Sequence, residues 1–200
     1  MTVHHSDPAM GNLNYERIDD DFYPTPSWMT HGLLGVASDQ MDSPIDLTVD
    51  WWEPACGEGH ISKVVRERSR GKECSTDLVP RGYGVGGIDF LKEKRRPNDT
   101  RLIITNPPYG DLAEDFIRHS LDLMKPVDGA VVMLLRNEYD CAKKRQYLFD
   151  HPAYHGKAIA TSRPRWIAGT KGSPRHNYSW FLWNWKPSNH PPRIYYFNKT

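Results

Sequence analysis

The clearest chemical signal in the chain comes from four consecutive residues, Asn106, Pro107, Pro108 and Tyr109. They follow an apolar run at 102–105, which predicts a buried strand that ends at the prolines, because proline cannot donate to a sheet ladder. An amino group on an aromatic ring is a poor nucleophile, because its lone pair is delocalised. The side-chain oxygen of Asn106 and the carbonyl of Pro107 can accept both amino hydrogens and localise that lone pair, while Tyr109 can stack on the ring. The segment therefore predicts a catalytic site for an exocyclic amine, with a plain structural turn as the alternative.

A glycine-rich turn upstream is the first candidate for binding a cofactor. It comprises Glu53, Pro54, Ala55, Cys56 and Gly57, followed by Glu58 and Gly59, and it stands between an expected strand and an expected helix. The glycines let a ligand approach the backbone closely. Two carboxylates here would repel phosphate, so the ligand is expected to be cationic or neutral. By itself, such a turn could also be a structural connection.

Two acidic residues stand at the ends of the next expected strands. Asp77 comes 24 residues after Glu53, where a doubly wound fold presents a carboxylate to ribose hydroxyls. Asp89 closes an expected third strand, where it can accept from an adenine amino group while Phe90 lines the ring. Each acid could instead be a solvated turn residue, and Phe90 a core residue. Because ligands bind beyond the carboxyl ends of the strands in such sheets, these segments are expected to meet there.

Alternating strands and helices are expected to position these residues. Strands are predicted at 47–53, 72–77, 102–105, 130–135, 158–167 and 178–185, with a further one ending near Asp89. Helices are predicted from Pro26 through Val36 and at 58–70, 111–124 and 140–149. This alternation predicts a three-layer α/β fold with a mostly parallel sheet.

Length, charge and cysteine spacing limit the function classes. The 200 residues suffice for one domain, expected at 21–200 behind a mobile arm at 1–20. The 26 Lys and Arg residues balance 25 Asp and Glu residues, but residues 143–175 are basic and could face a polyanion or form a solvated surface. Cys56, Cys74 and Cys141 are too far apart to suggest zinc or a redox pair, so no metal is expected. No apolar run is long enough to span a bilayer, so no membrane partner is expected.

Together, these residues resemble the S-adenosylmethionine-dependent amino-group DNA methyltransferases, in particular small adenine-specific enzymes of phages and prophages. The resemblance rests on the segment at 106–109, the glycine-rich turn and the run Phe22-Tyr23-Pro24-Thr25-Pro26, and it covers about residues 21–185. It implies a Rossmann-like class I methyltransferase fold with a mostly parallel seven-stranded sheet, an antiparallel C-terminal strand and helices on both faces. It also implies direct in-line transfer of the methyl group of S-adenosylmethionine to the N6 amino group of an adenine flipped out of DNA, without a metal.

The resemblance also assigns a place to the cofactor. The residues that would contact it are Tyr23, Pro24, Thr25, Glu53, Pro54, Ala55, Cys56, Gly57, Asp77, Asp89, Phe90 and Asn106. Tyr23 and Thr25 would contact the methionine part, and Asp77 would hold the ribose. Cys56 is implied to be a small packing residue, not a nucleophile.

Five residues further along the chain are expected to contact DNA. By the resemblance, Arg163, Arg165, Trp166, Arg175 and His176 border the target pocket, where phosphate contact or base stacking is expected. No insertion is long enough for a separate target-recognition domain. Sequence specificity is therefore expected to be short, relaxed or supplied by a partner, and a homodimer is an alternative. The enzyme is expected in the cytoplasm of a bacterium or of a phage-infected cell.

Two other functions remain open. Asn-Pro-Pro-Tyr also occurs in enzymes that methylate an RNA base amine or a protein glutamine amide. Those enzymes commonly carry a helical or RNA-binding module before the catalytic fold, whereas the cofactor segment here begins near Phe22. A non-catalytic nucleic-acid-binding module with the same fold is the second alternative, and it would have little need for Asp77, Asp89 and Asn106 together.

Overall fold

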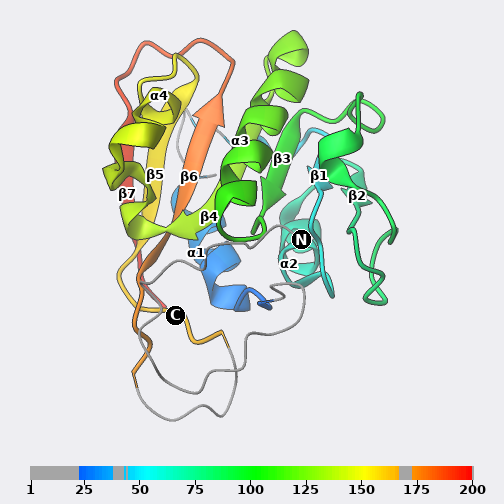
Figure 1. Cartoon of the computed structure of the whole chain (residues 1–200), viewed down its shortest axis with the longest axis horizontal. Coiled ribbons are helices and arrows are strands. Elements are labelled where there is room, and N and C mark those ends of the chain that lie inside the picture. Colours follow the sequence, from blue (N-terminus) through cyan, green and yellow to red (C-terminus); the bar gives the residue numbers. More distant parts are fainter. Residues whose placement is uncertain (1–22, 38–42, 44, 167–172, 200) are drawn as a thin grey trace, which may run out of the picture.

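One mixed sheet runs through the part of the chain that the computed structural model describes, which is residues 23–37, 43, 45–166 and 173–199 (Figure 1). The arm expected at 1–20 lies outside these residues. Across the sheet the strands are β2 (Glu73–Ser75), β1 (Trp51–Glu53), β3 (Leu102–Thr105), β4 (Ala130–Arg136), β6 (Tyr178–Asn184), β5 (Tyr154–Ala160) and β7 (Arg193–Phe197). Neighbouring strands are parallel, except that β6 is antiparallel to both β4 and β5. The predicted mostly parallel sheet of seven strands with an antiparallel strand near the C-terminus is confirmed.

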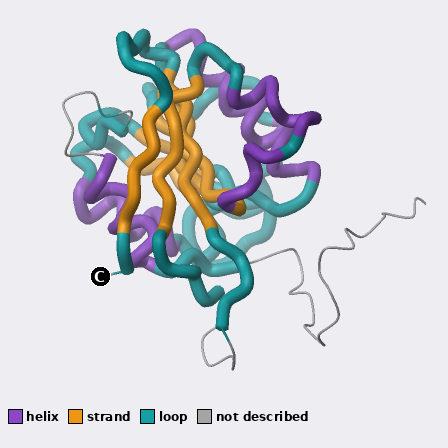
Figure 2. The backbone as a smooth tube through the Cα atoms, turned by 90° about the vertical axis from the view of Figure 1, so that its left-hand side faces the viewer, coloured by secondary structure: helices purple, strands orange, loops and turns teal. Residues whose placement is uncertain are grey.

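Helices cover both faces of the sheet, as predicted (Figure 2). Side chains alternate along each strand, so one strand supplies two separate cores. On β3, Ile104 packs with α1 (Ser27–Ala37) and α2 (His60–Arg68), whereas Ile103 packs on the other face with α3 (Asp111–Met124) and α4 (Gln146–Phe149). A strand buried on both faces needs a continuous apolar run, which explains why residues 102–105 are all buried.

Short 3-10 helices connect the main elements. They are η2 (Phe90–Lys92), η3 (Lys125–Val127), η4 (Asn137–Cys141) and η5 (Lys143–Arg145). The helix predicted at 140–149 is therefore wrong as one element, since only its last turn is α-helical. Asp140 forms an ion pair with Lys157 of β5 at 2.7 Å, and Arg145 donates to the carbonyl of Tyr139 at 2.9 Å. These tertiary contacts fix the backbone in short turns instead of one helix.

The strand expected before Asp89 is reduced to one bridge between Thr76 and Val85. Gly82, Gly84 and Gly87 in this segment have φ angles of 80°, 61° and 79°, which an extended strand does not allow. The seventh strand is instead β7, which the sequence analysis missed and which pairs with β5.

The other predicted elements agree with the structure within a few residues, apart from the strand predicted at 158–167. That strand is observed as β5, about four residues earlier, with a register irregularity between Tyr154 and Gly156. In the described part of the chain, no helix has both the length and the apolar character needed to cross a membrane.

The stability of the sheet is expected to depend on glycine at position 156. The φ angle of Gly156 is 134°, and a Cβ atom there would lie 1.9 Å from the carbonyl oxygen of Arg193. Gly156→Ala should separate β5 from β7 and cost at least about 1–3 kcal/mol of unfolding free energy. Gly35→Ala on α1, where a Cβ atom would meet nothing within 4 Å, should be neutral or stabilising. Thermal unfolding of both variants tests this, and equal melting temperatures would refute the tight β5–β7 contact.

Candidate active site

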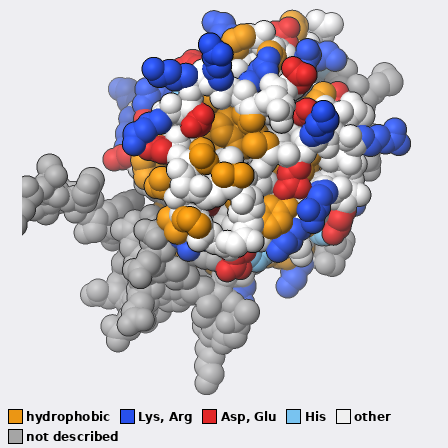
Figure 3. Space-filling model, turned by 90° about the vertical axis from the view of Figure 1, so that its right-hand side faces the viewer, with side chains coloured by type: hydrophobic (Ala, Val, Ile, Leu, Met, Phe, Trp, Pro, Cys, Tyr) orange, Lys and Arg blue, Asp and Glu red, His pale blue; other side chains and the backbone are white. Residues whose placement is uncertain are grey.

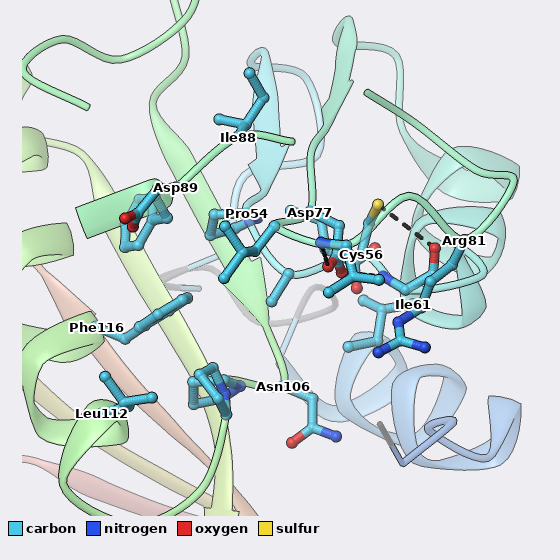
Figure 4. Close-up of a pocket in the computed structure, with 18 of the residues that line it drawn as sticks. Pro54, Cys56, Ile61, Asp77, Arg81, Ile88, Asp89, Asn106, Leu112 and Phe116 are labelled. Atoms are coloured by element: carbon cyan, nitrogen blue, oxygen red, sulfur yellow. Dashed lines mark hydrogen bonds between the residues drawn. The ribbon is translucent and has the colours of Figure 1, made fainter. Parts of the chain in front are cut away.

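A cavity of about 510 Å³ lies at the carboxyl ends of β1, β2 and β3 (Figure 4). This volume is in the range of small-molecule and cofactor sites. All the residues expected to contact a cofactor line it, namely Tyr23, Pro24, Thr25, Glu53, Pro54, Ala55, Cys56, Gly57, Asp77, Asp89, Phe90 and Asn106. The structure therefore brings together segments that are up to 83 positions apart in the sequence.

Several further lining residues were not singled out from the sequence. They are His60, Ile61, Leu78, Val79, Arg81, Ile88, Leu91, Lys92, Leu112 and Phe116. Pro107 and Pro108, which the sequence analysis placed in the catalytic segment, also line the cavity. Leu112 and Phe116 stand four residues apart on α3, so they share one helical face toward the cavity (Figure 4). The four-residue spacing of Leu112 and Phe116 can be read from the sequence, but the residues that face them across the cavity cannot.

The cavity opens to solvent beside the segment that follows β2. Leu78 lines the cavity and yet is 62% exposed, and Val85 nearby in the chain is 59% exposed. On the side of the molecule where β2 lies, apolar side chains gather near the centre of the face, with Lys and Arg side chains around them (Figure 3).

The glycine-rich turn is held to the end of β2 by Asp77. The backbone N–H of Gly57 donates to Oδ2 of Asp77 at 2.7 Å, and the N–H of Val79 donates to Oδ1 at 2.9 Å. Each carboxylate oxygen has a second lone pair that remains able to accept from a ligand hydroxyl. Gly59 has a φ angle of 77°, and a Cβ atom there would lie 2.5 Å from the Tyr83 ring, so only glycine fits this turn.

Glu53 lines the cavity and also anchors α2. Its Oε2 accepts from the backbone N–H of Ser62 at 2.8 Å and from the Ser62 hydroxyl. Helix α2 begins at His60, and its N-cap residue, Gly59, offers no side-chain cap, so the carboxyl of Glu53 accepts from a free N–H of the first turn. Burial raises the pKa of Glu53 well above its ordinary value, the bonds from Ser62 oppose this, and the nearby Glu73 and Asp77 add to the rise.

Cys56 is buried in the same turn. Burial, followed by the charges of Glu53 and Asp77, raises the pKa of its thiol to about 12. Its Sγ donates to the carbonyl oxygens of Tyr83 at 3.6 Å and Gly57 at 3.8 Å. A thiol that stays protonated at neutral pH is a poor nucleophile, which agrees with the packing role expected for Cys56.

The nitrogen of the Asn106 side-chain amide is hydrogen-bonded, whereas its oxygen is buried without a partner among the described residues. Its Nδ2 donates to the Tyr23 carbonyl at 3.4 Å and to Oγ1 of Thr25 at 3.2 Å. Its Oδ1 is buried and accepts no hydrogen bond from any residue that the structure describes. A buried acceptor without a partner is costly, and such groups in native structures call for a functional explanation. The site therefore offers a fixed acceptor at the carboxyl end of β3, beside the cavity (Figure 4).

Three other residues expected to contact a ligand, Tyr109, Phe90 and Asp89, make contacts with other residues of the protein. Tyr109 does not line the cavity, and its ring packs edge-on against Tyr23 at 5.3 Å between centroids. Phe90 is only 2% exposed and packs against Trp52 and Phe116, so it is a core residue as well as a lining residue. Asp89 caps η2 through the N–H of Leu91 and forms an ion pair with Lys92 at 2.9 Å.

The basic residues expected to contact nucleic acid lie near the carboxyl end of β4, next to β3. Arg163 donates to Oδ1 of Asn177 at 3.0 Å and to the Pro174 carbonyl at 3.2 Å. Arg163, Arg165 and Arg175 are exposed. Trp166 is not free for stacking on both faces, because it packs edge-on against Tyr178 at 4.7 Å.

Arg136, at the end of β4, joins this basic group and was missed from the sequence. It pairs in register with Tyr178, and the N–H of the next residue, Asn137, donates to the Asn177 carbonyl at 3.0 Å. Burial lowers the pKa of His176, and Arg136, Arg175 and Arg163 lower it further. Three arginines therefore act on His176, and the nearby Glu138 raises its pKa and partly offsets them. Among the described residues, no cluster of His, Cys, Asp and Glu is suited to hold a metal ion.

Comparisons with known proteins identify the fold. No protein-family model matches the sequence, and no curated protein matches it either. Among solved structures, a candidate class I S-adenosylmethionine-dependent methyltransferase from Listeria monocytogenes superposes with a TM-score of 0.61 at 12% identity, covering 92% of this chain and 68% of that one. A type I restriction-modification methyltransferase subunit from Streptococcus thermophilus gives 0.56 at 12% identity, covering 88% and 47%.

A candidate RNA methyltransferase from Pyrococcus horikoshii gives a TM-score of 0.59 at 16% identity, covering 86% of this chain and 91% of that one. The chain spans less than half of the Streptococcus subunit but nearly all of the Pyrococcus protein. The chain therefore has the Rossmann-like fold of the class I methyltransferases, as the sequence predicted.

Glu53 makes a pH-dependent prediction. Unfolded Glu titrates near pH ~4.3. Because the pKa of Glu53 is raised in the folded protein, the unfolded chain ionises first as pH rises, and the wild type loses stability until the folded carboxyl also ionises. Glu53→Gln keeps an acceptor for Ser62 but cannot ionise, so its melting temperature should rise relative to that of the wild type as pH increases above ~4. The gain should be about 2–4 °C for each kcal/mol of stability that the wild type loses.

The control is Glu67→Gln on the exposed face of α2, which should follow the wild-type curve. A constant difference between Glu53→Gln and wild type across this range would show that the Glu53 carboxyl does not titrate differently in the folded protein.

Proposed function

We propose that the protein is an S-adenosylmethionine-dependent methyltransferase that methylates the N6 amino group of adenine in DNA. The observation that carries the proposal is the Asn106 amide, whose Oδ1 is a fixed, unpartnered acceptor beside a cavity of cofactor size. The fold supports methyl transfer, and the acceptor supports an amine as its target.

The residues of the cavity fit S-adenosylmethionine. Its sulfonium carries a methyl group that an amine can attack directly, and the transfer needs no metal, because the leaving group is a neutral thioether. Asp77 retains lone pairs for the ribose hydroxyls, and Asp77 and Asp89 are acids in the cavity lining, which suits a cationic ligand. Gly57 has a φ angle of 53°, which favours glycine, and because glycine has no side chain, a ligand can approach the backbone there.

The chain's own residues would act on the amine. Oδ1 of Asn106 and the carbonyl oxygen of Pro107 would accept hydrogen bonds from the two N–H groups of the amine and so localise the nitrogen lone pair. Pro107 and Pro108 stiffen the loop that carries these acceptors. Because burial raises the pKa of the Cys56 thiol, Cys56 is a poor nucleophile, and the proposed transfer is direct from the cofactor to the amine.

Two features favour DNA as the substrate. The group formed by Arg136, Arg163 and Arg175 lies at the end of β4, next to the strand that carries Asn106, where it can bind phosphates on either side of a flipped base. The similar Streptococcus protein is a methyltransferase subunit of a restriction-modification system. We propose that sequence specificity is short or comes from a partner, a second copy of the chain included. The enzyme would act in the cytoplasm of a bacterium or of a phage-infected cell.

An RNA base amine is the second candidate, because the Pyrococcus protein of similar length is a candidate RNA methyltransferase. The test is methyl transfer from radiolabelled S-adenosylmethionine to unmethylated DNA, RNA and bacterial protein in parallel, followed by nucleoside analysis. Label in N6-methyladenine of DNA supports the proposal. Label only in RNA or protein replaces DNA with that substrate, and cofactor binding without any transfer refutes catalysis by the chain alone.

Asn106 provides the first prediction. Asn106→Ala removes the acceptor for the target amine and should lower kcat by about 10²–10³-fold, the scale of one removed transition-state contact. Affinity for S-adenosylhomocysteine, measured by calorimetry, should change little. Asn198→Ala, an exposed asparagine after β7 at the far edge of the sheet, is the control. Unchanged turnover in Asn106→Ala would rule out the acceptor mechanism.

The arginines provide the second prediction. Arg136→Gln and Arg175→Gln should each weaken DNA binding similarly for all sequences and reduce the slope of log affinity against log salt by about 1 for each lost phosphate contact. Lys186→Gln is the control. Lys186 follows β6, and because β6 is antiparallel to β4, Lys186 lies toward the amino end of β4, away from the basic group. Salt slopes that match the wild type would place the DNA elsewhere.

A further inference from the structure

The contact between Thr25 and Asn106 points beyond the proposed methyl transfer itself. The sequence analysis assigned Thr25 to the cofactor, but its Oγ1 accepts from Nδ2 of Asn106 at 3.2 Å. We infer that Thr25, together with the carbonyl of Tyr23, is a positioning residue that turns the Asn106 amide so that its oxygen faces the substrate amine. The inference rests on the proposed function, because it concerns the acceptor that this function needs.

The amide of asparagine has two unlike ends, and only one of them can accept. A rotation of about 180° would put two N–H donors where the substrate amine requires an acceptor. The Nδ2 atom of Asn106 has two acceptors here, the Tyr23 carbonyl at 3.4 Å and the Thr25 hydroxyl at 3.2 Å. A carbonyl cannot donate, so Oδ1 in its place would face the lone pairs of Tyr23 and be repelled. The segment therefore selects the orientation in which Oδ1 is left open.

The segment itself is held firmly. Thr25 is 3% exposed and stands between Pro24 and Pro26, which restrict the backbone on both sides. Helix α1 begins two residues later, and the indole N–H of Trp180 on β6 donates to the Met29 carbonyl at 2.9 Å. The sheet thus fixes α1, and α1 fixes the acceptors that orient Asn106. Supporting residues of this kind can hold a reactive side chain in its geometry without contacting the substrate themselves.

Thr25→Val tests the inference, because it keeps the shape of the side chain and removes the hydroxyl. It should lower kcat about tenfold, the scale of one neutral hydrogen bond, and leave the KM for DNA nearly unchanged. Affinity for S-adenosylhomocysteine should also stay within about twofold, whereas a residue that contacts the cofactor would lose affinity. Thr25→Ser, which keeps the oxygen, should restore most of the lost kcat.

Thr30→Val is the matched control. Thr30 lies on α1, is fully buried, and its Oγ1 has no hydrogen-bond partner among the described residues, so losing this hydroxyl should not lower kcat. If Thr30→Val lowers kcat as much as Thr25→Val, or if cofactor affinity falls in step with kcat, the positioning role is wrong.

A second measurement does not depend on activity. In proton–nitrogen NMR spectra of the ligand-free protein, the two side-chain amide protons of Asn106 should shift in Thr25→Val and remain near their wild-type positions in Thr25→Ser and Thr30→Val. Unchanged amide signals in Thr25→Val would overturn the inference even if kcat falls. A wild type that methylates no substrate would overturn the proposed function instead, and the amide signals would still decide the Thr25–Asn106 contact.

Discussion

The buried contact between Glu53 and Ser62 is the interaction on which the rest of the site depends. It joins the end of β1 to the first turn of α2, whose preceding residue, Gly59, has no side chain to cap the helix. The Ser62 hydroxyl lies 2.6 Å from that of Ser75 on β2, and Ser75 donates to Glu73. These contacts link the ends of both strands to the first turn of the helix and so restrain their relative positions.

The other wall of the cavity is fixed by a separate support. Asn106 depends on the segment before α1, and α1 depends on β6 through Trp180. The glycine-rich turn follows β1 and the acceptor follows β3, and because these strands pair in parallel, the two lie side by side at the cavity. Such an arrangement lets a ligand lie between two rigid walls, while the segment after β2, with its exposed Leu78, forms the mouth.

The sequence predicted most of this arrangement because its signals were local and strong. The run at 102–105 and the amphipathic pattern at 111–124 gave β3 and α3 with their observed bounds. Acids and glycines at strand ends pointed to Glu53, Gly57 and Asp77, which line the cavity. Tyr23, Pro24 and Thr25 also line it, but they were expected only from the family resemblance. These successes follow from the rule that parallel strands bring their carboxyl ends to one edge.

The failures came where tertiary contacts outweigh local pattern. The short segment that forms β7 has no clear strand pattern of its own, and it becomes a strand by pairing with β5. The glycines before Asp89 have positive φ angles, which prevent the strand expected there. Arg136 looked like the end of an apolar strand, and only the pairing of β4 with β6 places it beside Asn177 and His176. An aromatic such as Tyr109 can be named from a motif, but the neighbours of its ring are set by Tyr23, 86 positions earlier in the chain.

The chemistry left open in the cavity follows from which polar atoms the protein has already used. Oε2 of Glu53 is engaged with α2, and the oxygens of Asp77 hold two backbone N–H groups but keep lone pairs. Oδ1 of Asn106 is unused, and the carbonyl of Pro107 has lone pairs beside it. These open groups are all acceptors, whereas the cationic side chains of Arg81 and Lys92 come from the segment that borders the mouth. A cavity of this kind favours ligands that are rich in donors or positive charge, so the same set of acceptors suits ribose hydroxyls, a sulfonium ion and an exocyclic amine.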